Sequence, residues 1–429
     1  MKNNVKNLIE FIDHSPSCFH VIENAKKQFL EHGFTELKEK EYWNLEEGKS
    51  YFVTRNGSSM IAFHLPKKDF QGFHIVASHS DSPTYRIKEQ PEMSVEKHYT
   101  KLNIERYGGM IPETWFDRPL SVAGRIIIEE NGQIKDQLIN IDRDLMIIPN
   151  LAIHMSRSSS ESKQLNPQKD LLPLCGGNLT KDGFEEMIAK ESGVEKEDIL
   201  SYDLFLYNRM RGTTLGINEE FVAAPKLDDL ECAYSSIEGM LNAKLSKDYV
   251  TVCAVFDNEE VGSGTKQGAG STFFPEVLKR ISYLCGKNEE EYYMAVADSF
   301  MLSADNAHAV HPNYQDKTDP TNRPYINEGI VLKYNASQKY TTDANSAALV
   351  KYLCKKEKIK CQVFFNRSDM LGGSTLGNIL TGQVSIKAAD IGLPQLSMHS
   401  TYETAGCKDL DDMITMMRSF YELGKEVQI

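Results

Sequence analysis

The sequence has no long apolar run and no secretory leader pattern. No stretch approaches the roughly 20 apolar residues that a membrane-spanning helix needs. The first residues, MKNNVKNLIEF, also lack the apolar core and small-residue cleavage site of a signal peptide. The sequence therefore predicts a cytoplasmic protein with no membrane partner.

The sequence also lacks a basic stripe. Its formal net charge is −13, and its most basic stretch is the short CKKEKIK at 354–360. Proteins that bind nucleic acids neutralise phosphates with clustered Lys and Arg side chains. No nucleic-acid partner is therefore expected.

Paired cysteines are absent as well. The eight cysteines are scattered and form no C-x-x-C pair, and they lie mostly in apolar surroundings such as TVCAVF and KYLCKK. Such cysteines are typical of reduced core residues rather than of disulfides or a zinc ribbon.

Apolar patterning over the 429 residues predicts an α/β fold in two parts. Residues 1–92 and 221–429 alternate helices with apolar strands, among them 73–77, 252–256 and 293–297. We expect a mostly parallel central sheet sandwiched by helices. Residues 93–220 contain strand patterns without such helices, including a hairpin at Asn131-Gly132 and a strand over 145–155. They predict an inserted β-rich domain.

Polar residues that can bind a metal follow several of these strands. They are His79 and Asp81 in SHSD, Asp257, Glu259 and Glu260 in DNEE, Asp305 in SADN, and His399 in SMHS; Asp228 begins a helix. Strands of an open α/β sheet deliver their ends to one ligand-binding edge. Taken singly, these residues also fit a solvated acidic turn, a helix N-cap at Asp228 or an Asx turn at Asp81.

Taken together, two histidines and three carboxylates at one edge favour a site for two divalent metals. Imidazole with carboxylate suits zinc, and an aspartate can bridge two ions. Two such metals can activate a water and polarise a scissile carbonyl. One glutamate of the adjacent pair can bind metal while the other acts as general base. Asp81 is placed to accept the second imidazole N–H of His79.

Five segments carry a resemblance to a known family. HSDSP at 79–83, KLDDL at 226–230, FDNEEVGS at 256–263, SADNAHAVHPNY at 303–314 and MHSTYE at 398–403 resemble, in order and spacing, the motifs of the aspartyl aminopeptidase family of dinuclear zinc exopeptidases. The resemblance extends along essentially the whole chain. It implies an α/β catalytic domain interrupted by a β-rich dimerisation or lid domain, assembled as a tetrahedral dodecamer.

The resemblance also implies a role for each site residue. His79 and Asp305 would hold one zinc, Glu260 and His399 the other, and Asp228 would bridge them, with Glu259 as the base. The cofactors would be two Zn²⁺ per subunit, with Co²⁺ or Mn²⁺ as substitutes.

Substrate contacts in the family fall on His308, Lys333, Tyr340 and His154, the last reaching a neighbouring subunit's site. An alternative for His154 is a third histidine ligand beside His79 and His399.

The implied activity is removal of single N-terminal residues, with a preference for Asp or Glu, from peptides with a free N-terminus. The acidic preference rests on a pocket that departs from the family, because Tyr402 stands where Arg is usual. A related dinuclear zinc N-acyl-amino-acid deacylase or carboxypeptidase is an alternative. From another class, the alternative is a non-catalytic oligomeric shell protein.

Overall fold

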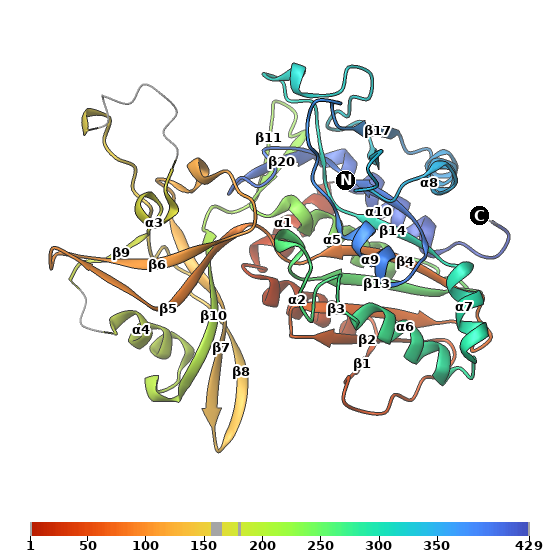
Figure 1. Cartoon of the computed structure of the whole chain (residues 1–429), viewed down its shortest axis with the longest axis horizontal. Helices are drawn as coiled ribbons and strands as arrows, with labels where there is room; N and C mark the ends of the chain where they lie inside the picture. The colour runs from red at the N-terminus through yellow and green to blue at the C-terminus, as the bar shows by residue number, and fades with distance from the viewer. Residues whose placement is uncertain (1, 156–164, 179–181, 428–429) are drawn as a thin grey trace.

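The computed structural model of the chain describes residues 2–155, 165–178 and 182–427. These residues form a mixed α/β fold with ten α-helices and three sheets of nine, six and five strands. Figure 1 shows the six-stranded sheet lying to one side of the other two. Within the described part of the chain, no helix is long and apolar enough to cross a membrane.

The nine-stranded sheet has the order β1-β2-β3-β13-β4-β14-β18-β16-β17. Pairing is parallel for β1 with β2, β4 with β13 and β14, β14 with β18, and β16 with β17, and antiparallel at the other three contacts. The strands are Thr35–Leu37, Lys49–Arg55, Ser59–Leu65, Val250–Phe256, Phe73–His79, Phe300–Ala304, Lys387–Gly392, Ile330–Tyr334 and Cys361–Phe365 in the same order.

Helices cover both faces of this sheet, because its central strands are apolar on both sides. One face packs in a core with residues of α1 (Lys2–Asp13), α2 (Cys18–Glu31), α5 (Leu227–Leu241), α8 (Ala344–Glu357) and α10 (Cys407–Tyr421). The other face packs with residues of α6 (Phe273–Leu284), α7 (Glu289–Ala297) and α9 (Leu376–Gln383).

The strand predicted over 293–297 is wrong, because these residues lie in helix α7. The Asn288 side chain accepts a hydrogen bond from the Glu291 backbone N–H, and the Glu291 side chain accepts one from the Asn288 backbone in return. This capping box and the acidic first turn favour a helix. The strand begins a few residues later, as β14.

The six-stranded sheet is antiparallel, with the order β8-β7-β10-β5-β6-β9. Its strands are Gln133–Asn140, Leu120–Glu130, Ile199–Asn208, Thr84–Val95, Tyr99–Tyr107 and Leu174–Gly176. The predicted hairpin is confirmed, because Asn131 and Gly132 join β7 to β8. We call residues 84–208 the six-stranded unit. The predicted domain boundaries at 93 and 220 stay a prediction.

Two features of the six-stranded unit differ from expectation. Helix α4 (Gly183–Ser192) packs on its core through Phe184 and Ile188, and α3 (Pro167–Asp170) is a single turn. The strand predicted over 145–155 is wrong, since this segment forms isolated bridges and the short helix η2 (Ile153–Met155). Here the apolar run includes half-exposed and exposed residues, so its hydrophobicity reflects surface rather than a buried strand.

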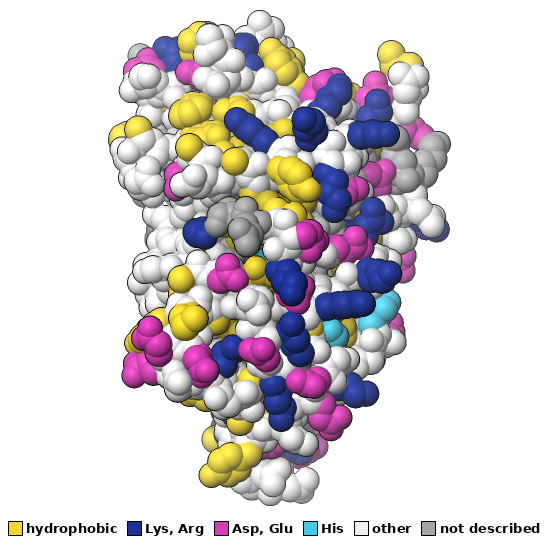
Figure 2. Space-filling model, turned by 90° about the vertical axis from the view of Figure 1, so that its right-hand side faces the viewer, with side chains coloured by type: hydrophobic (Ala, Val, Ile, Leu, Met, Phe, Trp, Pro, Cys, Tyr) yellow, Lys and Arg dark blue, Asp and Glu magenta, His cyan; other side chains and the backbone are white. Residues whose placement is uncertain are grey.

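The third sheet has the order β11-β12-β20-β19-β15, formed by Thr213–Leu215, Phe221–Ala224, Glu403–Gly406, Pro394–Leu396 and Ala307–His308. The remaining short helices are η1 (Pro112–Trp115), η3 (Lys196–Asp198), η4 (Glu259–Val261) and η5 (Gln315–Lys317). On the face in Figure 2, Lys and Arg side chains are interspersed with Asp and Glu.

Candidate metal centre

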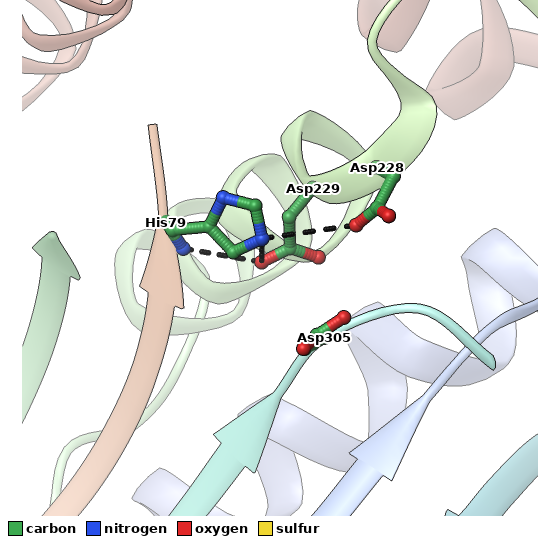
Figure 3. A group of neighbouring side chains, drawn as sticks. All are labelled: His79, Asp228, Asp229 and Asp305. Atoms are coloured by element: carbon green, nitrogen blue, oxygen red, sulfur yellow. Dashed lines mark hydrogen bonds and ion pairs between the residues drawn. The ribbon is translucent and has the colours of Figure 1, made fainter. Parts of the chain in front are cut away.

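Three neighbouring parallel strands end at the same edge of the nine-stranded sheet. His79 is the last residue of β4 and pairs in register with Phe256, the last residue of β13. Asp257 and Asp305 directly follow β13 and β14. Figure 3 shows His79 and Asp305 at this edge, facing the start of helix α5. The polar strand ends predicted from sequence therefore meet in space.

Three overlapping groups of side chains at this edge have ligand atoms within 4.8 Å of one another. They are His79 with Asp228, Asp229 and Asp305; His79 with Glu259 and Glu260; and Asp228 with Glu260 and His399. The structure thus brings together all six residues predicted from sequence as ligands or base, His154 excepted.

Asp228 lies between the two histidines. Its Oδ1 is 3.7 Å from Nε2 of His79, and its Oδ2 is 3.3 Å from Nε2 of His399. Oε1 of Glu260 is 3.4 Å from the same nitrogen of His399. One carboxylate therefore faces two separate nitrogen ligands, one through each oxygen.

Buried oxygens without partners fit a divalent cation here. Among the described residues, no hydrogen bond reaches Oδ1 of Asp228, Oδ1 of Asp229 or Oε1 of Glu260. Buried carboxylate oxygens are normally hydrogen-bonded, and leaving them bare is costly. A metal would supply the missing partner, and the mixture of imidazole and carboxylate donors suits zinc.

The electrostatics of the edge also fit a cation. Burial, followed by the Asp228 charge, raises the pKa of Glu260 well above its usual range. Burial lowers the pKa of His79, but Asp229 and Asp81 raise it more, so that it ends well above its ordinary value. Several carboxylates share one poorly solvated space, and a divalent ion would neutralise them.

Asp81 orients three of these groups. Nδ1 of His79 donates a 3.1 Å hydrogen bond to the Asp81 carbonyl oxygen and lies 3.4 Å from the carboxylate. Because Nδ1 makes this hydrogen bond, Nε2 is the ring nitrogen that faces the carboxylate groups and that would bind a metal after losing its proton. The Asp81 carboxylate also accepts the backbone N–H groups of Glu259 and Glu260, each at 3.1 Å.

The adjacent glutamates lie in the short helix η4 and are half-buried. Glu260 approaches His399, whereas the potential ligand group that contains Glu259 includes only His79 and Glu260 beside it. Burial raises the pKa of Glu259 to about 8, with His79 lowering it and Asp305 raising it. Of the two glutamates, Glu260 is therefore the one that also approaches the second histidine.

Sequence reasoning missed two residues of the centre. Asp229 accepts the His79 backbone N–H at 3.1 Å, and its Oδ2 is 3.9 Å from the imidazole. Glu403 accepts the backbone N–H groups of Asp228 (2.9 Å) and His399 (2.6 Å). The adjacent acids in KLDDL and the last residue of MHSTYE were the available signals.

The predicted substrate residues differ in exposure. Lys333 is 2% exposed; its Nζ donates to the carbonyls of Asp305 (2.7 Å) and Asn306 (3.2 Å), and it lies 5.1 Å from the Tyr340 ring. His308 is exposed, with its ring 6.0 Å from that of Phe364.

His154 is exposed on η2 and belongs to none of the potential ligand groups within the described ranges. Its role as a substrate contact or third histidine ligand stays a prediction.

Comparisons with known proteins agree on one family. The family model described as aminopeptidase I zinc metalloprotease (M18) matches residues 11–421. A probable M18 family aminopeptidase 2 of Clostridium novyi (strain NT) is 46% identical over 99% of this chain and 100% of its own length. Its counterpart in Pseudomonas aeruginosa (strain UCBPP-PA14) is 36% identical over 96% and 97% of the two chains.

The chain is also similar in fold to solved structures. The chain is similar to one in the cryo-EM structure of the Ape4 and Nbr1 complex, with a TM-score of 0.94, 36% identity, and coverage of 98% of this chain and 85% of that one. A chain of the S. cerevesiae mApe1 dodecamer gives a TM-score of 0.86 at 26% identity, covering 98% of this chain and 97% of that one.

Proposed function

The chain belongs to the aminopeptidase I zinc metalloprotease (M18) family, and we propose that it removes single N-terminal residues from peptides. We propose that each subunit uses two zinc ions for this reaction. The observation that carries the proposal is the position of Asp228, whose two oxygens face His79 and His399 separately. A single carboxylate placed in this way can bridge two metals.

The proposed ligands divide between two ions. His79 and Asp305 would hold one zinc, Glu260 and His399 the other, and Asp228 would contact both. Within the described residues, one oxygen of Asp228 and one of Glu260 accept no hydrogen bond, and the 3.4 Å approach of Glu260 to His399 also supports this division. Co²⁺ and Mn²⁺ accept similar donors and are expected to substitute.

Glu259 is the proposed general base. Bound zinc would supply a Lewis acid that lowers the pKa of water and polarises the scissile carbonyl. The Glu259 carboxylate would accept a proton from the attacking water and then donate it to the leaving amine. The hydrogen bond from its backbone N–H to Asp81 fixes its position relative to His79.

We propose a preference for Asp or Glu at the peptide N-terminus. A substrate carboxylate that enters a poorly solvated pocket needs a nearby cation. Lys333 is the proposed cation, with Tyr340 and His308 as further contacts. The approach of Lys333 Nζ to 3.7 Å from Oδ1 of Asp305 supports its nearness to the centre.

The assembly is proposed to be a tetrahedral dodecamer in which His154 reaches a neighbouring subunit's site. Apolar side chains on the segment around η2 support a contact with another copy: Leu151, Ile153 and Met155 are 53%, 73% and 74% exposed. Light scattering tests this proposal, and a fully active monomer would contradict the shared site.

The proposed location is the cytoplasm. The eight cysteines carry free thiols, as expected in a reducing compartment.

Titration of dialysed enzyme with zinc tests the activity. Free and N-acetylated Asp and Leu peptides serve as substrates, because only an aminopeptidase requires the free α-amine. Activity on the free peptides should increase until about two equivalents of zinc per subunit have been added. The N-acetylated peptides should not be cleaved at any zinc concentration. Equal cleavage of the acetylated peptides would contradict aminopeptidase activity and favour a deacylase.

A further inference from the structure

A tyrosine of the six-stranded unit reaches the candidate metal centre. Tyr107 is the last residue of β6, and its hydroxyl donates a 2.7 Å hydrogen bond to Oδ2 of Asp81. The same hydroxyl accepts a 2.8 Å hydrogen bond from Nδ2 of Asn258. Its ring packs edge-on against Phe205 of β10, with centroids 5.8 Å apart. Tyr107 is therefore fixed within its own sheet and bonded to two residues outside it.

The partner of Tyr107 is the residue that orients the centre. The Asp81 carboxylate accepts the backbone N–H groups of Glu259 and Glu260 and lies 3.4 Å from Nδ1 of His79. Burial, followed by the charge of Asp81, raises the pKa of Tyr107 well above its ordinary value, so the hydroxyl keeps its proton and remains a hydrogen-bond donor to Asp81. The hydrogen bond from Tyr107 thus joins the six-stranded unit directly to Asp81, the residue that positions the proposed base Glu259.

The residues after Tyr107 contact the two proposed ligands of the second zinc. Gly108 has φ +77°, and a Cβ there would lie 3.1 Å from Cβ of Glu260. Ile111 donates its backbone N–H to the carbonyl of His399 at 3.0 Å. The segment 107–111 therefore forms part of the wall of the centre.

A pocket of about 350 Å³ lies beside this link and is lined by Tyr107, Asp81, Asp228 and Glu403, among others. Tyr107 therefore borders the space next to the candidate metal centre.

We propose that Tyr107 is a positioning residue for the metal centre, which acts through Asp81 to couple the six-stranded unit to the binding of zinc and to the placement of Glu259. The proposal rests on the proposed zinc centre. It assigns to the six-stranded unit a role inside its own subunit, separate from any contact between subunits.

The test compares Tyr107→Phe with Tyr85→Phe. Each substitution removes one tyrosine hydroxyl from the six-stranded unit. The Tyr85 hydroxyl has no hydrogen-bond partner in the described parts of the chain, and its ring packs on Trp115. Zinc affinity is measured by competition with a chelator, Co²⁺ loading is followed by absorption spectroscopy, and kcat and KM are measured with a free Leu peptide.

For Tyr107→Phe we expect about 10-fold weaker zinc binding or more, as for other partners of metal ligands, and a changed Co²⁺ spectrum. We also expect kcat to fall with KM changed by less than about 2-fold, because the loss affects the reacting groups rather than peptide binding. Tyr85→Phe should match wild type in all of these measurements.

Wild-type zinc affinity in Tyr107→Phe would overturn the proposal, and so would an equal loss in Tyr85→Phe. Unfolding of zinc-free Tyr107→Phe where zinc-free Tyr85→Phe stays folded would also overturn it, since Tyr107 would then support the fold as a whole. If wild type binds zinc but cleaves no peptide, the proposed function fails, while the comparison of zinc affinities still decides the role of Tyr107.

Discussion

The central strands of the nine-stranded sheet and the strands of the six-stranded unit differ in burial. All seven residues of β4 and all seven of β13 are buried, whereas β8 is mostly exposed. The charged and ligand-type side chains at the central strands of the nine-stranded sheet are concentrated at the edge where β4, β13 and β14 end. A sheet packed on both faces holds such groups at fixed positions, while a sheet with an open face is suited to contacts with other parts of the protein.

The adjacent glutamates test the chemistry of the buried edge, with the largest expected effect. Glu259→Gln should reduce kcat by roughly 10²- to 10⁴-fold while zinc content stays near that of wild type, because the proposed base is lost and the proposed ligands remain. Glu260→Gln should lose zinc as well. Atomic absorption after dialysis, together with kinetics, measures both. Metal loss in the first variant and full occupancy in the second would reverse the assignment.

Core truncation tests the difference in burial directly. Leu302 of β14 is fully buried, so Leu302→Ala should lower the free energy of unfolding by about 2–5 kcal/mol. Ile134 of β8 is 74% exposed, and Ile134→Ala should change it by less than about 0.5 kcal/mol. Denaturant unfolding of both variants gives the comparison. An equal decrease in the free energy of unfolding for the two variants would contradict this difference, because the exposed Ile134 would then contribute as much to stability as the buried Leu302.

Lys333→Met tests whether the buried lysine at the edge recognises substrate. If Lys333 pairs with a substrate carboxylate, the substitution should reduce kcat/KM for Asp peptides. The reduction should correspond to a loss of about 1.5–3 kcal/mol of transition-state stabilisation, and the loss should be much smaller for Leu peptides. Lys339→Met is the matched control, because Lys339 also donates to a backbone carbonyl, that of Gly372. Equal losses on both peptides would instead assign Lys333 to holding the loop of Asp305, and the acidic preference would have to be dropped.

Glu403→Gln tests how the edge is held together. The amide nitrogen cannot accept a hydrogen bond, so one of the backbone N–H groups of Asp228 and His399 loses its partner. Zinc affinity should fall by about 10- to 100-fold.

The control for Glu403→Gln is Asp409→Asn. Asp409 is a buried carboxylate that accepts the backbone N–H groups of Asn327 and Gly329, outside the candidate metal centre. Chelator competition on both variants separates a specific effect from general loss of structure. Equal zinc affinity in Glu403→Gln and wild type would show that the N–H contacts are dispensable.

The sequence predicted the position of the centre better than its support. His79 and Glu260 follow apolar strands, and a strand end is a local signal that needs only the pattern around it. The strand predicted over 293–297 is wrong because these residues form a continuous apolar run, while the helix cap, Asn288, lies outside that run.

The contacts that support the centre could not be predicted from sequence. Tyr107 bonds to Asn258, and Glu403 bonds to Asp228, across long separations in the chain that no local pattern encodes. The burial of Lys333 also depends on the loop after β14, whose carbonyls accept hydrogen bonds from its Nζ. These are properties of the assembled tertiary structure.

The order of the nine-stranded sheet has a consequence for biosynthesis. Strand β18 lies between β14 and β16 and comes late in the chain, and His399 follows it. A ribosome-bound chain that already contains His79, Asp228 and Glu260 therefore has neither a complete central sheet nor its second histidine. Domains fold as units during synthesis, and here the sheet is complete only once β18 has been made. The nascent polypeptide is consequently unable to assemble the proposed metal centre until His399 has been synthesised.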